Sequence, residues 1–106
     1  MKSFKVPIFG CKIHLYDDME KAEEYVANYG SLGSSHEYSA WVVALGSHIV
    51  MAFDKEQLSA GVIAHESYHA ARAVLRHCEI KVHKKDEELT AYLVEYIANQ
   101  CAARLS

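Results

Sequence analysis

Two histidines separated by three residues, with a glutamate directly after the first, form the pattern H-E-x-x-H at His65, Glu66 and His69. On a helix, residues four positions apart lie above one another on the same face, so both imidazoles can bind a single divalent ion. Zinc suits such a pair, because it accepts imidazole nitrogen in a tetrahedral arrangement. The spacing of the two histidines therefore predicts a zinc site on a helix.

Glu66 follows the first histidine and is rotated from it by about 100° around the helix axis. That rotation keeps its carboxylate beside the ion without making it a ligand. Zinc lowers the pKa of water towards 7, and a neighbouring carboxylate can accept the proton that this water releases. We therefore expect Glu66 to act as the general base of a hydrolytic reaction. The alternative is that His65 and His69 are ordinary solvent-facing residues of an amphipathic helix.

A catalytic zinc site uses three protein ligands and a water molecule, so one more donor is required. His77 is excluded, because eight helical residues separate it from His69 by about 12 Å along the axis. The remaining downstream candidates are His83, Glu87 and Glu88. Glu88 is favoured, since it begins a predicted helix that could pack beside the first. Acids in a first helical turn also complement the helix dipole without binding any metal, which is the alternative for both glutamates.

The hydrophobic pattern of the chain changes between period two, typical of strands, and period 3.6, typical of helices. In chain order the predicted elements are a strand within 4–16 interrupted near Pro7 and Gly10, a helix over 18–29, a β-hairpin within 37–53, a helix over 54–77 and a helix from 86 to about 104. The order β-α-β-β-α-α predicts one domain of the α+β class spanning residues 1–106. We expect a small antiparallel or mixed sheet packed on the H-E-x-x-H helix and the C-terminal helix.

Particular residues mark the predicted helix starts. Asp17 with Glu20, and Asp54 with Gln57, have the spacing of capping pairs. Gly61 lies inside the H-E-x-x-H helix, where glycine costs about 1 kcal/mol relative to alanine. A close neighbour packed against its bare backbone would account for that cost.

Composition excludes several functional classes. The formal net charge of -3 lacks the basic footprint that nucleic-acid binding requires, and the basic segment 76–85 is interpreted as a solvated connection. No apolar run is long enough to span a membrane, and the N-terminus lacks the features of a secretory signal. Cys11, Cys78 and Cys101 are odd in number and contain no C-x-x-C pair, which is typical of buried thiols in a cytoplasmic protein.

The segment HESYHA, followed by DEELTAYLVEYI, resembles the gluzincin metallopeptidases, including their thermolysin-like and aminopeptidase branches. The resemblance covers residues 37–104. It implies a minimal zincin-like fold in which His65, His69 and Glu88 bind zinc while Glu66 activates water. The compact order of elements is also similar to small H-E-x-x-H proteins of the kind that phages and prophages encode.

The sequence departs from the larger gluzincins, whose second lobe completes the cleft and supplies a tyrosine or histidine that stabilises the oxyanion. No residue of this chain matches that lobe, and Tyr68, Tyr92 and His83 are the candidates for the same purpose. A second copy of the chain or a larger partner could complete the cleft.

The expected function is that of a zinc-dependent peptidase, which hydrolyses peptide bonds through metal-activated water. Its substrate would be a peptide or protein, added as a strand to an exposed edge of the hairpin within 38–53. The alternative is a non-catalytic protein-binding module on a zinc-binding zincin scaffold. We expect no partnership with nucleic acid or membrane.

Overall fold

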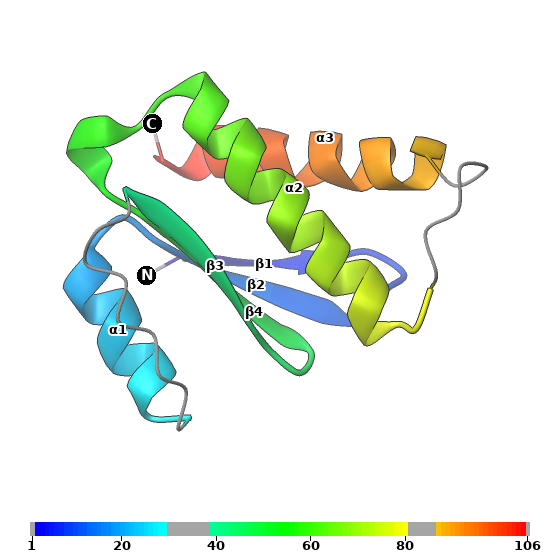
Figure 1. The fold of residues 1–106 in the computed structure, drawn as a ribbon, viewed down its shortest axis with the longest axis horizontal. Coiled ribbons are helices and arrows are strands. Elements are labelled where there is room, and N and C mark those ends of the chain that lie inside the picture. The colour runs from blue at the N-terminus through cyan, green and yellow to red at the C-terminus, as the bar shows by residue number, and fades with distance from the viewer. Residues whose placement is uncertain (1, 30–38, 81–86, 106) are drawn as a thin grey trace.

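A computed structural model describes residues 2–29, 39–80 and 87–105 of the chain (Figure 1). Its elements in order are strands β1 (Lys2–Val6) and β2 (Cys11–Tyr16), helix α1 (Met19–Ala27), strands β3 (Ala40–Leu45) and β4 (His48–Phe53), a short 3₁₀ turn η1 (Lys55–Gln57), and helices α2 (Ala60–His77) and α3 (Glu87–Leu105). The strands form a mixed sheet in the order β1-β2-β4-β3. The predicted α+β class with a small mixed sheet is confirmed.

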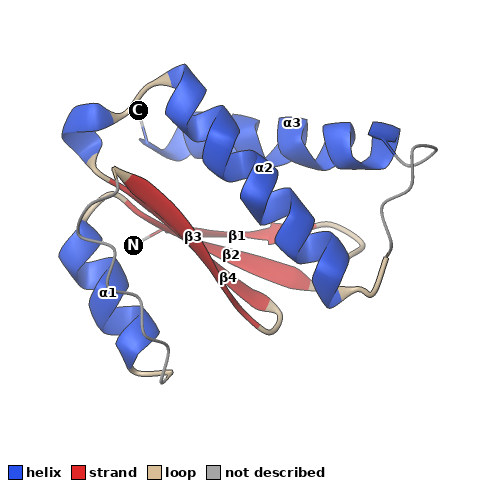
Figure 2. Cartoon of the chain, in the orientation of Figure 1, coloured by secondary structure: helices blue, strands red, loops and turns tan. Residues whose placement is uncertain are grey.

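The sheet separates two hydrophobic layers, with α2 and α3 on one face and α1 on the other (Figure 2). Strand β4 contributes to both layers, because successive side chains point to opposite faces. Ile49, Met51 and Phe53 pack with α2 and α3, whereas Val50 and Ala52 pack with α1. These five side chains are fully buried, so β4 fixes the positions of the helices on both faces of the sheet.

Strands β2 and β4 pair in parallel at the centre of the sheet, which leaves β1 and β3 at its edges. Strands β3 and β4 form the predicted hairpin, joined by the turn Gly46-Ser47. Gly46 has φ +64° there, a left-handed conformation that glycine adopts without steric cost. The hairpin places β3 beside α2, which contacts it directly.

The prediction of one interrupted strand within 4–16 is wrong, because β1 and β2 are two strands of an antiparallel hairpin. The turn between them includes Ile8 with φ +76° and Gly10 with φ +67°. Both residues have a left-handed backbone conformation, which allows the chain to reverse its direction. Pro7 precedes them and has no N–H for a sheet ladder. The observed order is therefore β-β-α-β-β-α-α.

The start of α1 is shifted by one residue from the prediction. Asp18, and not Asp17, caps this helix, since its Oδ1 accepts hydrogen bonds from the backbone N–H groups of Glu20 at 3.0 Å and Lys21 at 3.2 Å. Both residues are aspartates, so the capping pattern could not distinguish the two positions.

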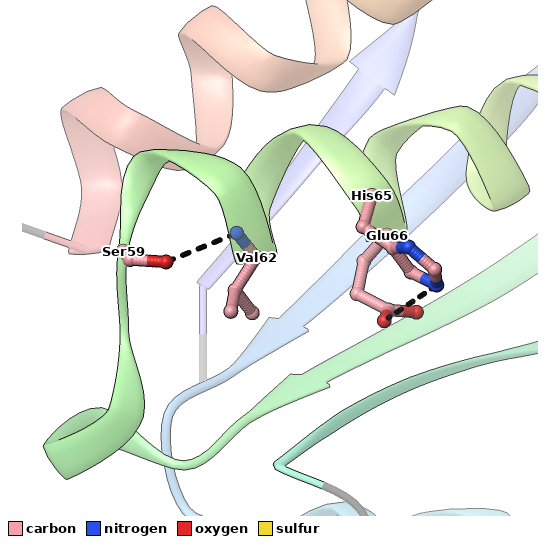
Figure 3. A network of polar contacts seen from close by, with 4 residues as sticks. All are labelled: Ser59, Val62, His65 and Glu66. Atoms are coloured by element: carbon pink, nitrogen blue, oxygen red, sulfur yellow. Dashed lines mark hydrogen bonds and ion pairs between the residues drawn. The ribbon is translucent and has the colours of Figure 1, made fainter.

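The predicted start of the H-E-x-x-H helix at Asp54 is also wrong. Asp54 caps only η1, because Leu58 returns the backbone to an extended conformation with ψ 132°. Helix α2 then begins after Ser59, whose Oγ accepts a hydrogen bond from the N–H of Val62 at 3.1 Å (Figure 3). The motif therefore lies two turns from the helix start.

The first strand and the last helix are in contact. The Tyr96 hydroxyl of α3 donates a hydrogen bond to the Lys5 carbonyl of β1 at 3.2 Å, and the Tyr96 ring meets the Phe4 ring edge to face. The Arg104 guanidinium lies 5.2 Å from the centre of the Phe4 ring. Helix α3 thus closes the core over β1.

No helix among the described residues is both long and apolar enough to cross a bilayer.

Candidate metal centre and groove

Helix α2 presents its histidines to solvent because its opposite face is held in the core. Ala70, Ala71 and Val74 are completely buried in the cluster that α2 shares with α3 and the sheet. Their spacing fixes the rotation of the helix about its axis. His65 and His69 consequently lie on the exposed side of α2.

The two predicted histidine ligands lie together. Their ring centroids are 4.9 Å apart with an interplanar angle of 69°, and the side chain of His65 is 67% exposed. Exposed imidazoles on adjacent turns are suitable donors for a zinc ion. The structure therefore brings two of the predicted ligands to one place.

Glu66 lies beside this pair but is largely buried. Its side chain is 10% exposed, and its Oε2 lies 3.8 Å from Nε2 of His65. Figure 3 shows both side chains projecting from the same side of α2. The carboxylate therefore lies close to one imidazole of the pair.

The third predicted ligand is not assembled with the histidines. Glu88 is exposed in the first turn of α3, and Glu87 lines a separate pocket between α2 and α3 with Tyr68 and Arg72. Within 2–29, 39–80 and 87–105, no group of three or more histidine, cysteine, aspartate or glutamate side chains could hold a metal ion. The alternative ligand His83 lies outside the described residues. Glu88 therefore stays a prediction.

Two tyrosines were candidates for stabilising an oxyanion. Tyr68 is 44% exposed, its ring centroid lies 6.0 Å from that of His69, and its hydroxyl accepts a hydrogen bond from Arg72 at 3.0 Å. Tyr92 is 60% exposed on α3. Of these two side chains, only Tyr68 has a ring contact with the histidine pair.

A groove of about 760 Å³ runs between α2 and β3. The side chains of α2 along it lie at helical spacing on one face of the helix. They are His65, Glu66, His69, Ala73, Arg76 and His77. The H-E-x-x-H motif thus occupies one part of the groove, while Arg76 and a third histidine, His77, occupy another.

The other wall of the groove is the edge of β3. The Ser39 carbonyl accepts a hydrogen bond from the N–H of Asp54 at 2.8 Å, so the odd-numbered residues of this strand direct their backbone groups towards β4. The intervening residues Ala40, Val42 and Ala44 direct theirs away from β4, because bonding alternates along an antiparallel pair. No other described strand pairs with this edge. Strand β3 is thus an edge strand of the described sheet, and the exposure of its edge stays a prediction.

Gly61 lies at the end of the groove next to Glu66, in a smaller pocket of about 360 Å³ that also includes Ala40. A Cβ built on Gly61 would meet only the Ser59 Oγ, at 3.9 Å. The prediction of a close neighbour is therefore wrong. The missing side chain instead leaves this end of the groove open.

Sequence reasoning missed Arg76 and His77 as groove residues. The pattern suggested His77 as a metal ligand, which helix geometry excluded, Arg76 as part of a solvated segment, and both as basic residues of a last helical turn. The signal that could have identified them is their spacing of 11 and 12 residues from His65, which returns to the same helix face after about three turns. The motif itself ends at His69, about two turns before Arg76.

Comparisons of this chain with protein-family models, with curated proteins and with solved structures find no match. Its function must therefore be inferred from its own geometry. The relevant features are two adjacent imidazoles, a buried carboxylate beside them and, across the groove, the edge strand of the described sheet.

Proposed function

We propose that this protein is a zinc-dependent peptidase that hydrolyses peptide bonds in the groove between α2 and β3. The observation that carries the proposal is the placement of His65 and His69 with the buried carboxylate of Glu66 on one wall of a groove. Its other wall is the edge of β3, with which no further strand of the described residues pairs. The imidazole pair suits zinc, and the edge suits a peptide.

A peptide would bind chiefly through its main chain. The outward N–H and C=O groups of Ala40, Val42 and Ala44 can pair with an extended segment laid along the groove. Such pairing extends the sheet by one strand and brings the peptide past the histidines. Because main-chain groups are common to all sequences, these contacts supply affinity with little selectivity.

When bound, zinc would supply Lewis acidity that lowers the pKa of water and polarises the peptide carbonyl. His65 and His69 would hold the ion through their exposed nitrogens. Glu66 would accept a proton from the attacking water as the new C–O bond forms. It would return that proton to the amine nitrogen as the C–N bond breaks.

The third ligand is part of the proposal. Glu88 is exposed in the first turn of α3, so its carboxylate is not committed to the core. Glu87 and His83 are the alternatives. Glu88→Gln should weaken zinc binding, whereas Glu87→Gln should not. Equal zinc affinities for wild type and Glu88→Gln, measured by competition with a chelator, would exclude Glu88.

The finer fold assignment belongs to the same proposal. A minimal zincin domain is supported by the position of the motif in α2, by the packing of α2 and α3 on one face of the sheet, and by an edge strand beside α2. A cytoplasmic location is supported by the free thiols of Cys11, Cys78 and Cys101.

The central experiment combines elemental analysis with cleavage of a fluorescence-quenched peptide library. We expect about one zinc ion per chain, with loss of the ion in His65→Ala and His69→Ala. Glu66→Gln should keep the ion and lose at least about 100-fold in kcat/KM, the usual contribution of a general base. Glu24→Gln, an exposed substitution on α1, is the matched control. A wild-type protein that takes up no zinc under replete conditions would end the proposal.

A second candidate function is a peptide-binding module without turnover. The observation that favours it is that the described residues assemble the groove and its strand edge, but not a three-ligand metal set. Such a module would capture a peptide equally well with wild-type Glu66 and with Glu66→Gln. Zinc-dependent hydrolysis of the captured peptide would refute this alternative.

A further inference from the structure

We infer that the groove selects peptides carrying an acidic side chain, which Arg76 and His77 bind at the end remote from Glu66. The inference rests on the peptide-binding part of the proposed function and is independent of zinc and of turnover. It names the substrate class that the main-chain contacts along β3 leave undefined.

The remote end of the groove carries an arginine and a histidine, and no described acid along its walls. Arg76 and His77 belong to the last turn of α2, and both line the groove. The facing residues of β3 are Ala40, Val42 and Ala44, which carry no charge. Arg76 forms no ion pair within the described residues, and an arginine stays protonated at any physiological pH. Its guanidinium is therefore available to a carboxylate.

The two walls of the groove match in length and direction. From His65 to Arg76 the helix rises by about 16 Å, and from Ala40 to Leu45 the strand extends by about 17 Å. Ala40 lies near Glu66, because the two share the small pocket beside Gly61, and both walls run from there to the remote end (Figure 1). A peptide along β3 would thus pass the motif first and Arg76 last.

These lengths place the acidic side chain on the peptide. An extended chain advances about 3.3 Å per residue, so Arg76 lies roughly four to five residues from the bond held at Glu66. Side chains of a strand alternate between faces, and only every second residue of the peptide would face α2. An acid should therefore strengthen binding at alternate positions and have no effect between them.

The alternative explanation for Arg76 is that it stabilises helix α2, because basic residues in the last turn interact favourably with the helix dipole. That interaction requires no particular position around the helix axis. Arg76, however, lies on the same face as His65, His69 and Ala73, inside the groove. The formal net charge of the chain is -3, so a cationic site here is a local feature and not a consequence of overall composition.

The test measures binding of fluorescein-labelled octapeptides to the Glu66→Gln protein, which prevents cleavage. Each peptide carries one glutamate at a different position, and a matched set carries glutamine instead. We expect peptides with glutamate at alternate positions to bind about fivefold more tightly than the matched glutamine peptides. Because salt screens the charges, this difference should decrease as the salt concentration is raised from about 50 to about 500 mM. Arg76→Gln should abolish the difference.

Lys21→Gln on α1 is the control, because it removes one exposed positive charge far from the groove. Three results would each overturn the inference. They are equal affinity for glutamate and glutamine peptides, a preference for glutamate that survives Arg76→Gln, and no binding of any peptide. Failure of the peptidase proposal would be recognised separately, as zinc-free protein that still shows the preference. Cleavage without any preference would overturn this inference alone.

Discussion

Replacement of Gly61 by alanine should stabilise the protein while lowering the proposed peptidase activity. Gly61 is exposed in the first turn of α2, and an added Cβ would contact only the Ser59 Oγ at an ordinary distance of 3.9 Å. The substitution therefore reduces the conformational freedom of the unfolded chain without introducing a clash. The gain should be about 0.5–1 kcal/mol, and for a domain of this size the melting temperature should rise by about 2–6 °C.

The measurement is urea unfolding followed by circular dichroism, in which the midpoint should increase while the slope stays constant. Ala64→Gly is the matched control, because Ala64 is exposed on the same helix three residues later and should lose about 1 kcal/mol. If Gly61→Ala is neutral or destabilising while the control behaves as expected, the backbone of Gly61 is not free and the reasoning fails. The added methyl also narrows the pocket beside Glu66, so kcat/KM should decrease as stability increases.

Four further predictions follow from the same structure. Ser59→Ala should lower the free energy of unfolding by about 1 kcal/mol in urea titrations, because α2 loses its N-terminal cap. The pKa of His14 lies below its usual value near 6.5, chiefly because the ring is buried and secondly because His48 is close to it. The unfolded chain then binds the proton more tightly, so the free energy of unfolding should fall as the pH drops below about 6.5, and His14→Gln should reduce that slope. Burial raises the pKa of Cys101 to about 12, so iodoacetamide should leave this thiol unmodified at pH 8 until urea unfolds the protein. Ala44→Pro should fold but bind peptides about fivefold more weakly, because it removes an outward N–H, whereas Val43→Pro should lose about 3 kcal/mol or more of stability by breaking a bond to β4.

The elements that could be predicted are those whose signal lies within one segment. The β3–β4 hairpin and helix α2 each carry a clear period, and the i, i+4 spacing of His65 and His69 is a property of one helix. The N-terminal hairpin was missed because the apolar alternation continues on both sides of its turn. The turn itself depends on a left-handed backbone at Ile8, which no residue preference predicts.

The parts of the site that could not be predicted depend on contacts between elements. Whether Glu88 reaches the histidines is determined by how α2 crosses α3 and by the connection over 81–86. The spacing of residues within one segment determines neither this helix crossing nor the path of the connection. The relation of Arg76 to Ala44 likewise requires β3 to lie along α2, which follows from packing of the sheet and not from either segment alone.

The contact of Phe4 in β1 with Tyr96 and Arg104 in α3 joins residues made early and late in translation. The ribosome adds roughly 5–20 residues per second, so the first strand emerges several seconds before the helix that covers it. Until then, a nascent chain already carrying His65, Glu66 and His69 exposes the apolar face of its sheet. These three residues are thus synthesised before the core is closed, and a prematurely terminated chain would expose apolar surface that cellular quality control recognises.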